Sequence, residues 1–505
     1  MAFRRSQSVG AGVAAVATAV AITLALQPSG SAATGLSAAP LGVNVAPWDG
    51  VYTGSSAADV RPMLSAAGIG QLRYGGGSYA DLYNWQTNLD VGACQQFGAS
   101  ASECTAKNPL GFAEFSRQAR AIGAQSLVTV NYGSGTPAQA AAWVSEAAHA
   151  AGEDVALWEV GNEDYGCWET NDKLAGPPAY YQGYQPSVNG DPDNATCPQT
   201  FQGAAAGMRT LAHSYAVNAE QFLTAMKAAD PSAEIGVPWA FGPDVPGSAV
   251  VDNSEWNDEV LRADGADIGF VDAHYYPFTF SGGTGGVNPS VPQVLHALQQ
   301  IPSLQASIRQ ELASRDPTAA VVIGETAISN GSTTTGCTPV GAVFAAGDVL
   351  SWLAAGAQSV DWWSLNDTAN TGASCVNPGS GLFNGAGQPT AETPYYGYLL
   401  ASRLARPGAQ LTFLATSDPA DVLAYQSWRP DGKHAVAFIN LDASSARTVT
   451  YAAPEGLAGT LNYWSYSAGS QNATSSKIET GTTPALSVAR GIGLPPESVT
   501  VLETR

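Results

Sequence analysis

Eight short runs of apolar, mostly β-branched residues recur between residues 41 and 364, and this recurrence constrains the fold more than any other feature of the chain. Most of the runs are separated by stretches in which apolar residues repeat at helical spacing. Strands that alternate with helices pair in parallel through right-handed crossovers. The eight runs are Leu41–Ala46, Gln71–Tyr74, Ser126–Asn131, Val155–Val160, Glu234–Pro238, Phe270–Tyr275, Ala319–Gly324 and Ser359–Ser364.

Eight parallel strands close a (β/α)8 barrel, so we predict an α/β fold with a TIM barrel over residues 41–395. An open doubly wound sheet is the alternative, and it is less favoured because neither G-x-G-x-x-G nor G-x-x-x-x-G-K-[ST] occurs. After residue 395 short strand-like runs follow, joined by turn signals such as Pro430-Asp431-Gly432. This pattern predicts a C-terminal antiparallel β-sandwich over residues 396–505, with residues 34–40 as a candidate added strand.

The first 33 residues have the three parts of a secretory signal peptide. Arg4-Arg5 is followed by an apolar run from about Val9 to Leu26 and then by the small residues Ser31-Ala32-Ala33. A membrane anchor is the alternative, but the run is rich in Ala and Gly and ends in a small-residue site. We therefore expect residues 1–33 to be removed and the mature chain to be secreted, outside the membrane.

Six cysteines occur after this segment, and export favours disulfides. Six cysteines allow 15 pairings. We favour pairs of sequence neighbours, because each such pair brackets one loop-like stretch. None of the cysteines shows the C-x-x-C spacing of a zinc site, so we predict no metal. The favoured pairs are Cys94–Cys104, Cys167–Cys197 and Cys337–Cys375.

The charge balance is strongly acidic, with 21 Lys and Arg against 42 Asp and Glu and a net charge of −21. Nucleic acids and anionic membranes are bound through basic surfaces, so neither is an expected partner. A neutral ligand fits this balance better than a polyanion does.

Acidic residues follow two of the predicted strands where those strands end. Gly161-Asn162-Glu163 comes after the fourth run, and Glu325 comes after the seventh. The carboxyl ends of barrel strands meet at one mouth, so the two glutamates should face each other there. Either one alone could be a solvated loop residue. Together they form the arrangement that cleavage of a glycosidic bond requires.

These residues resemble the retaining glycoside hydrolases of clan A. In that clan the acid/base Glu follows Asn on strand four, and the nucleophile Glu ends strand seven. Leu72–Asp81 is similar to the L-R-Y-P-G-G stretch of arabinofuranosidases and heparanase-like glucuronidases, with Gly75 in place of Pro. Family 39, which holds β-xylosidases, is similar in layout. The resemblance covers residues 41–395, and a trailing β-sandwich recurs in several families of the clan.

The resemblance implies roles for individual residues. Glu163 would be the general acid and then the general base, and Glu325 would be the nucleophile that forms a glycosyl-enzyme ester. Asn162 would bind the sugar hydroxyl next to the anomeric carbon. Arg73 would lie under Glu325 and keep it ionised; a salt bridge at the barrel rim is the alternative for this residue.

Strand six ends in His274-Tyr275-Tyr276-Pro277. In the clan an aromatic residue or His at this point orients the nucleophile. Period-two alternation does not decide which side chain points inward. We favour Tyr276 facing Glu325 and His274 lying deeper in the site, with a core histidine as the alternative.

Further candidates for substrate binding stand at strand ends, because aromatic faces stack on sugars and short polar groups bind hydroxyls. Any single Trp is more often a core residue. The candidates are Trp48, Asp49, Asn131, Tyr132, Trp239, Trp362, Trp363 and Asn366. The long insertion 164–201, directly after Glu163, is expected to form a wall of the site.

We therefore predict a secreted retaining glycosidase that acts by double displacement on a neutral oligo- or polysaccharide, without a cofactor. Arabinose- or xylose-containing plant-type glycans are favoured by the Leu72–Asp81 resemblance. A glucuronide is less favoured, because Arg73 is the only cation seen at a strand end. A transglycosylase on the same scaffold and a non-catalytic sugar-binding protein remain the alternatives.

Overall fold

The computed structural model describes most of the chain after residue 34. The described residues are 35–90, 106–149, 155–166, 169, 171, 173, 205–241, 254–264, 267–278, 289–329, 335–367, 381–384, 389–451, 457–467, 478–485 and 491–505. The predicted signal peptide and most of the insertion 164–201 lie outside them. So do five of the six cysteines and the side chain of Cys337, which leaves the predicted disulfides untested. Among the described residues, no helix combines the length and the apolar character needed to cross a membrane.

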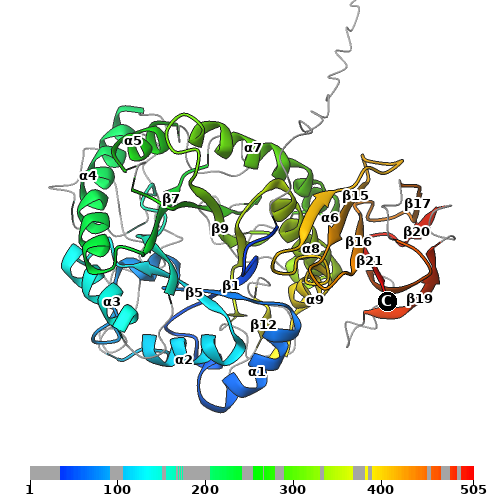
Figure 1. The fold of residues 1–505 in the computed structure, drawn as a ribbon, viewed down its shortest axis with the longest axis horizontal. Helices are drawn as coiled ribbons and strands as arrows, with labels where there is room; N and C mark the ends of the chain where they lie inside the picture. Colours follow the sequence, from blue (N-terminus) through cyan, green and yellow to red (C-terminus); the bar gives the residue numbers. More distant parts are fainter. Residues whose placement is uncertain are drawn as a thin grey trace, which may run out of the picture. The chain divides into compact units, whose positions relative to one another are not determined.

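Eight of the described strands close into a parallel barrel (Figure 1). The strands follow one another around the barrel in chain order, and the last pairs with the first. They are β1 (Leu41–Val45), β2 (Gln71–Tyr74), β5 (Gln125–Val130), β6 (Val155–Val160), β7 (Glu234–Trp239), β8 (Phe270–Tyr275), β9 (Ala320–Thr326) and β10 (Ser359–Trp362). The predicted TIM barrel is confirmed, with strand ends within two residues of the predicted ones.

Helices surround the barrel in Figure 1. They are α1 (Gly54–Ala66), α2 (Phe112–Ile122), α3 (Pro137–His149), α4 (Ala205–Ala229), α5 (Ser254–Asp264), α6 (Val291–Ala297), α7 (Ile301–Leu312), α8 (Pro339–Ala355) and α9 (Thr393–Ala401). Local sequence sets some of their ends. Gly123 takes a left-handed conformation (φ 72°) that stops α2, and Ser290 with Gln293 forms a capping box that starts α6.

Short strands also occur in the segments that follow the barrel strands β2 and β10. β3 (Tyr83–Asn84) pairs with β4 (Leu89–Asp90) inside the segment after β2. β11 (Asn366–Asp367), β12 (Phe383–Asn384) and β13 (Thr390–Ala391) form a small sheet after β10.

The C-terminal part forms an antiparallel sandwich, as predicted. Six described strands make its main sheet, and two more make a smaller sheet. Val436, Phe438 and Leu502 from the main sheet share a core with Val449 and Leu494 from the smaller one. The main sheet runs β14 (Gln410–Phe413), β15 (Val422–Trp428), β16 (His434–Asn440), β21 (Ser498–Thr504), β18 (Thr460–Ser467) and β19 (Glu479–Pro484); the smaller sheet holds β17 (Arg447–Val449) and β20 (Ile492–Leu494).

Helix α8 joins the barrel to this sandwich. Every residue from Val340 to Leu353 is buried. A Cβ on Gly347 would lie 2.5 Å from Leu298 and 3.1 Å from Ile439 of β16, so glycine permits close packing there. The Ser351 Oγ lies 2.7 Å from the hydroxyl oxygen of Tyr425 in β15. The barrel and the inner face of the main sheet therefore share one core.

Two details at the junction differ from the expectation. The predicted boundary between residues 395 and 396 falls inside α9, because Pro394 starts a helix there. Residues 35–40 do not form a strand. Instead Leu36 exchanges two backbone hydrogen bonds with Gly408 and Ala409, just before β14.

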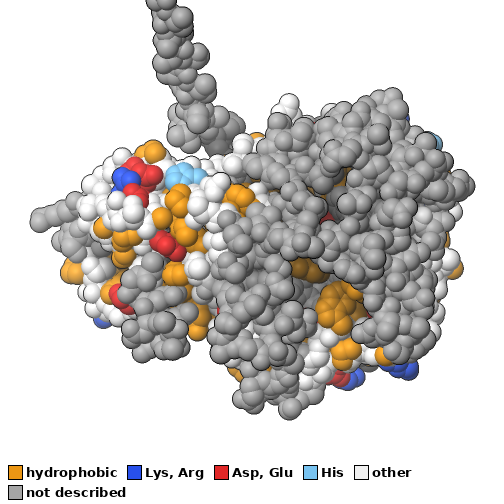
Figure 2. Space-filling view, turned by 180° about the vertical axis from the view of Figure 1, so that it is seen from behind, with side chains coloured by type: hydrophobic (Ala, Val, Ile, Leu, Met, Phe, Trp, Pro, Cys, Tyr) orange, Lys and Arg blue, Asp and Glu red, His pale blue; other side chains and the backbone are white. Residues whose placement is uncertain are grey.

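The surface described in Figure 2 mixes hydrophobic, acidic and basic side chains. Lys and Arg are scattered over the part of that face which the structure describes. Elsewhere on the sandwich, Arg447 pairs with Asp418, Asp421 and Asp442.

The barrel interior changes from apolar to charged along the strands. Leu127, Leu157, Phe270 and Val322 form a small apolar layer. Side chains two residues further along a strand point to the same side, so Glu159 follows Leu157 inward, and Asp272 follows Phe270 in the same way. The charged layer therefore lies toward the carboxyl ends of the strands, where the candidate site is.

Candidate active site

Glu163 and Glu325 face each other across the mouth of the barrel, with His274 between them. One side-chain oxygen of each glutamate and one ring nitrogen of His274 lie within 4.8 Å of one another. The Nδ1 of His274 is 2.9 Å from Oε1 of Glu163 and 3.4 Å from Oε2 of Glu325. The structure therefore brings together the two glutamates that the sequence predicted to meet at these strand ends.

A bulge in β9 turns Glu325 into the pocket. Asp272 pairs with Val322, but His274 pairs with Glu325, so β9 holds one extra residue there. Strict alternation would have pointed Val322 and Gly324 inward and Glu325 outward; an extra residue re-aims the side chain. Asp272 Oδ1 accepts a 2.6 Å hydrogen bond from the Gly324 N–H and thereby holds the bulge. A Cβ at Gly324 would lie 2.0 Å from the Asp272 carboxylate, so only glycine fits.

Two donors fix the Glu325 carboxyl group. Arg73 Nη1 donates to Oε1 at 2.7 Å, and the Tyr276 hydroxyl donates to Oε2 at 2.7 Å. Tyr276 thus has the orientation favoured from the sequence, and Arg73 lies beneath Glu325. The Glu325 side chain is only 7% exposed. Hydrogen bonds from a guanidinium and a phenol stabilise the ionised carboxylate.

Glu163 reaches the pocket from a left-handed turn after β6. Gly161 has φ 80° and Glu163 has φ 49°, and together they reverse the chain. The Tyr165 hydroxyl donates to Oε1 of Glu163 at 2.9 Å. The Glu163 side chain is 20% exposed, more than that of Glu325. This glutamate is the one that a group outside the barrel can reach.

Arg73 uses all five of its N–H groups beneath the pocket. Nε and Nη2 contact Oε2 of Glu159 at 3.2 and 2.8 Å. Nη2 also donates to Asn162 at 2.9 Å, and Nη1 donates to Asn44 at 2.9 Å and to Glu325 at 2.7 Å. The guanidinium is therefore committed to holding the site together.

Burial and charge act against each other in this layer. Burial alone lowers the pKa of Arg73, but the nearby Glu159, Glu325 and Asp272 carboxylates raise it well above its usual value. Burial raises the pKa of Glu159 to about 8 even though Arg73 lowers it. Burial likewise raises the pKa of Asp361, on β10, to about 8. In both groups burial favours the protonated form.

Asn162 is held by three neighbours. Its side-chain oxygen accepts from Arg73, its Nδ2 donates to Oε1 of Glu169 at 3.1 Å, and its backbone N–H donates to Asp81 at 3.3 Å. Ser78 donates to the same Glu169 oxygen at 2.7 Å. The amide thus has a fixed orientation beside Glu163.

Two of the predicted aromatic residues lie at the pocket, next to the glycine loop that follows β2. A Cβ on Gly76 would come within 2.6 Å of the Trp48 ring, and one on Gly77 within 2.9 Å of Trp363. The same position at Gly77 is 3.6 Å from Oε1 of Glu325. Asp49 and Asn366 interact with each other near this loop, and burial raises the pKa of Asp49 to about 7.

Three of the other predicted contacts are part of the core, and a fourth lies in a turn. Trp239, Trp362 and Tyr132 are buried in the main apolar cluster, so their prediction as substrate contacts is wrong. Trp239 and Trp362 point outward from their strands, toward the helices, because the inward positions alternate with theirs. Asn131 shapes a turn by accepting hydrogen bonds from the N–H groups of Ser134 and Gly135.

Sequence reasoning missed several site residues. Glu159, Asp272 and Glu169 contact the predicted residues Arg73 and Asn162. Tyr165, which lies in the insertion expected to form a wall, contacts Glu163. A signal was present for two of them: Glu159 and Asp272 are acidic residues inside otherwise apolar strands. A charge in such a strand requires a partner, and Arg73 of β2 and His274 of β8 were basic side chains within the barrel strands.

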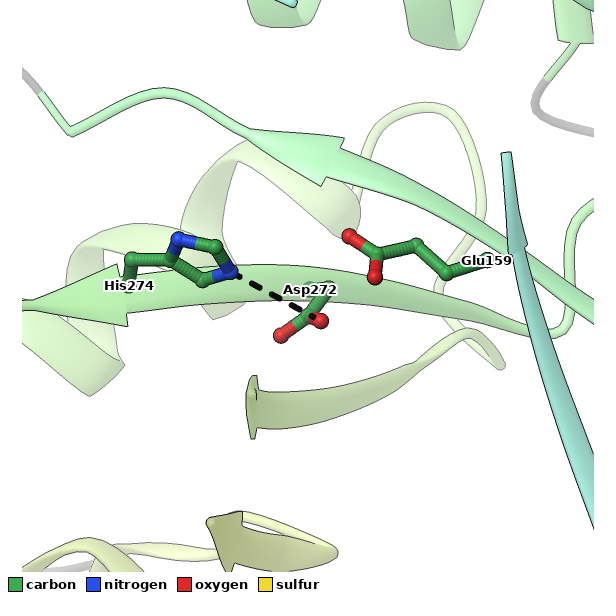
Figure 3. A group of neighbouring side chains, drawn as sticks. All are labelled: Glu159, Asp272 and His274. Carbon is green, nitrogen blue, oxygen red and sulfur yellow. Dashed lines mark ion pairs between the residues drawn. The ribbon is translucent and has the colours of Figure 1, made fainter. Parts of the chain in front are cut away.

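Two overlapping groups could chelate a cation by their geometry, Glu159–Asp272–His274 (Figure 3) and Glu163–His274–Glu325. Arg73 already pairs with Glu159, Asp272 and Glu325. The guanidinium therefore supplies positive charge at this point.

Comparisons with known proteins identify the fold. No family model matches the chain, and no curated protein matches it. An α-L-arabinofuranosidase from Thermotoga maritima, solved as an arabinose complex, has a TM-score of 0.62 at 16% identity, over 93% of this chain and 97% of that one. A family 51 α-L-arabinofuranosidase from Bifidobacterium longum reaches 0.66 at 15% identity, over 95% and 98%.

A Paenibacillus polymyxa xyloglucanase of glycoside hydrolase family 44 has a TM-score of 0.58 at 14% identity, over 93% of this chain and 96% of that one. All three cover nearly the whole of both chains, barrel and C-terminal domain together. The chain therefore has the fold shared by these clan A glycoside hydrolases.

Proposed function

We propose that this chain is a secreted retaining glycoside hydrolase that works by double displacement through a covalent glycosyl-enzyme. The observation that carries the proposal is the short separation of Glu163 and Glu325, with one oxygen of each within 4.8 Å. Retaining enzymes place their two carboxyl groups about 5–5.5 Å apart, so the close approach of these two glutamates supports direct attack by one of them.

The contacts assign different roles to the two glutamates. Arg73 and Tyr276 stabilise Glu325 as a carboxylate, so it is the nucleophile that attacks the anomeric carbon. Glu163 is more accessible and donates its proton to the leaving oxygen. Its Oε1 accepts from Tyr165, so the transferable proton resides on Oε2. In the second step the Glu163 carboxylate takes a proton from water, which attacks the anomeric carbon and breaks its bond to Glu325, so that Glu325 leaves as a carboxylate.

The substrate we propose is a neutral glycan that contains arabinose or xylose. The structural neighbours include arabinofuranosidases and a xyloglucanase. All five N–H groups of Arg73 are engaged by protein groups, so this cation is not available to a uronate carboxylate. Asn162 and the rings of Trp48 and Trp363 supply the hydroxyl contact and the stacking surface.

Purified protein should be screened on aryl glycosides, with α-L-arabinofuranoside, β-D-xyloside, β-D-glucoside and β-D-glucuronide as the set. We expect turnover of a pentoside. Proton NMR should show that the first product has the same anomeric configuration as the substrate. An inverted first product would refute the double displacement. Turnover of the glucuronide and of no other substrate in the set would refute the proposal that the substrate is a neutral glycan.

A further inference from the structure

Three buried polar atoms from two strands converge beneath the catalytic pair without hydrogen-bond partners among the described residues. They are Oε1 of Glu159, Oδ2 of Asp272 and Nε2 of His274. Figure 3 shows the three side chains turned toward one another, with the Asp272–His274 ion pair at 3.9 Å. A buried polar atom without a partner is costly, so this convergence needs an explanation.

His274 links this group to the candidate catalytic residues. Its Nδ1 edge faces Glu163 and Glu325, and its Nε2 edge faces Asp272. The proton on one ring nitrogen is determined by what the other ring nitrogen faces. A carboxylate behind a histidine fixes the ring's tautomer and stabilises the imidazolium.

We propose that Asp272 is a positioning residue that keeps a proton on Nε2 of His274, so that a cationic imidazole donates its Nδ1 proton to Glu163. This inference rests on the proposed function for its catalytic consequence. The cation next to Oε1 stabilises the carboxylate that Glu163 becomes after it protonates the leaving group, and so makes Glu163 a stronger acid.

The charges around His274 favour this state. Carboxyl groups face the ring from three other strands or their ends: Glu163 and Glu159 from β6, Glu325 from β9 and Asp361 from β10. Burial lowers the pKa of His274, but Glu325, Asp272 and Glu163 together raise it well above its usual value.

Arg73 on β2 is the opposing cation. It pairs with Asp272 Oδ2 at 3.4 Å and with Glu325 Oε1 at 2.7 Å. Asp272 has a second task, because its Oδ1 holds the Gly324 N–H of the bulge before Glu325. An asparagine can keep that bond through its oxygen and then presents an amide N–H to Nε2.

The test is the substitution Asp272→Asn with Asp348→Asn as the matched control. Asp348 is a fully buried carboxyl of α8 that accepts from Thr326 at 3.0 Å and lies outside the pocket. Ring-nitrogen NMR of 15N-histidine protein resolves the five histidines, and His274→Gln assigns the signal. We expect Nε2 of His274 to be protonated in the wild type and in D348N, and unprotonated in D272N.

A pH–rate profile supplies the catalytic readout. D272N should lower kcat/KM about tenfold. It should also move the basic limb to higher pH, because Glu163 loses the adjacent cation. A purely structural role would lower the rate without moving the limb, and that result would overturn the proposal.

The wild-type spectrum decides the question even if D272N does not fold. Nε2 of His274 found unprotonated at pH 7 in the wild-type chain overturns the proposal directly. The NMR needs no substrate, so the expected spectrum together with no glycosidase activity would refute the proposed function and leave the proton assignment standing.

Discussion

The barrel mouth and the layer between α8 and the C-terminal sheet are both buried, yet they are built from opposite materials. At the mouth, Arg73 and a set of carboxyl groups hold one another in place. Around α8, apolar side chains such as Ile439 pack beside the hydroxyl pair of Ser351 and Tyr425. At the mouth, the buried charged groups fix the orientation of the site side chains. In the α8 layer, the burial of apolar side chains stabilises the fold.

This contrast predicts that substitutions in the two regions separate into losses of activity and losses of stability. The largest effect should come from Glu325→Gln, which removes the proposed nucleophile and keeps the shape of the side chain. We expect kcat to fall at least about 10⁴-fold. The matched control is Glu497→Gln, a buried glutamate of the sandwich, which should leave kcat unchanged. Steady-state kinetics of both variants test this prediction. An equal loss of kcat in the two variants would contradict the proposed difference between the barrel mouth and the sandwich.

Glu163→Ala should produce a smaller loss that depends on the leaving group. General acid catalysis contributes about 10²–10⁴-fold, and aryl glycosides with acidic phenols need little of it. We therefore expect a large fall in kcat/KM on a natural glycan and a small one on a dinitrophenyl glycoside. Parallel assays on the two substrates measure the difference. Normal turnover of the glycan would remove Glu163 from the mechanism.

Ile439→Ala should show the opposite behaviour. It removes apolar volume where β16 meets Gly347, and the cavity should lower the free energy of unfolding by about 2–5 kcal/mol. The value of kcat/KM at 25 °C should stay that of the wild type. Urea unfolding and kinetics on the same sample test this, with Ile439→Val, expected to cost about 0.5–1.5 kcal/mol, as the graded control. A loss of activity without a loss of stability would contradict it.

The smallest effect concerns pH. Burial raises the pKa of Asp348 to about 8, so the folded chain holds a proton there that the unfolded chain releases near pH 4. Stability from this group is therefore greatest at low pH and is lost as pH rises from about 4 to about 8. Asp348→Asn should make the free energy of unfolding depend less on pH between 5 and 8. An unchanged slope in urea titrations at those pH values would show that Asp348 is ionised when folded.

Much of the site could be predicted because a barrel brings strand ends together. Strand ends place the two glutamates at one mouth once eight strands are assigned, and the resemblance to clan A added Arg73, His274 and Tyr276. Trp239, Trp362 and Tyr132 were misplaced because an aromatic residue at a strand end serves the core as readily as a pocket. An aromatic side chain that points into the barrel can line the site, whereas one that points toward the helices joins the core. Which of the two occurs depends on the alternation of side chains along each strand.

The sequence by itself determined the alternation of strands and helices, the closed barrel and the two glutamates at its mouth, since these depend on local periodicity and strand count. Tertiary structure decided the rest. The bulge at Gly324 that turns Glu325 inward, the Arg73 network and the approach of Asp272 to His274 arise from contacts between strands far apart in the chain. Local sequence carries no record of which strand lies opposite, so such pairings appear only when the barrel closes.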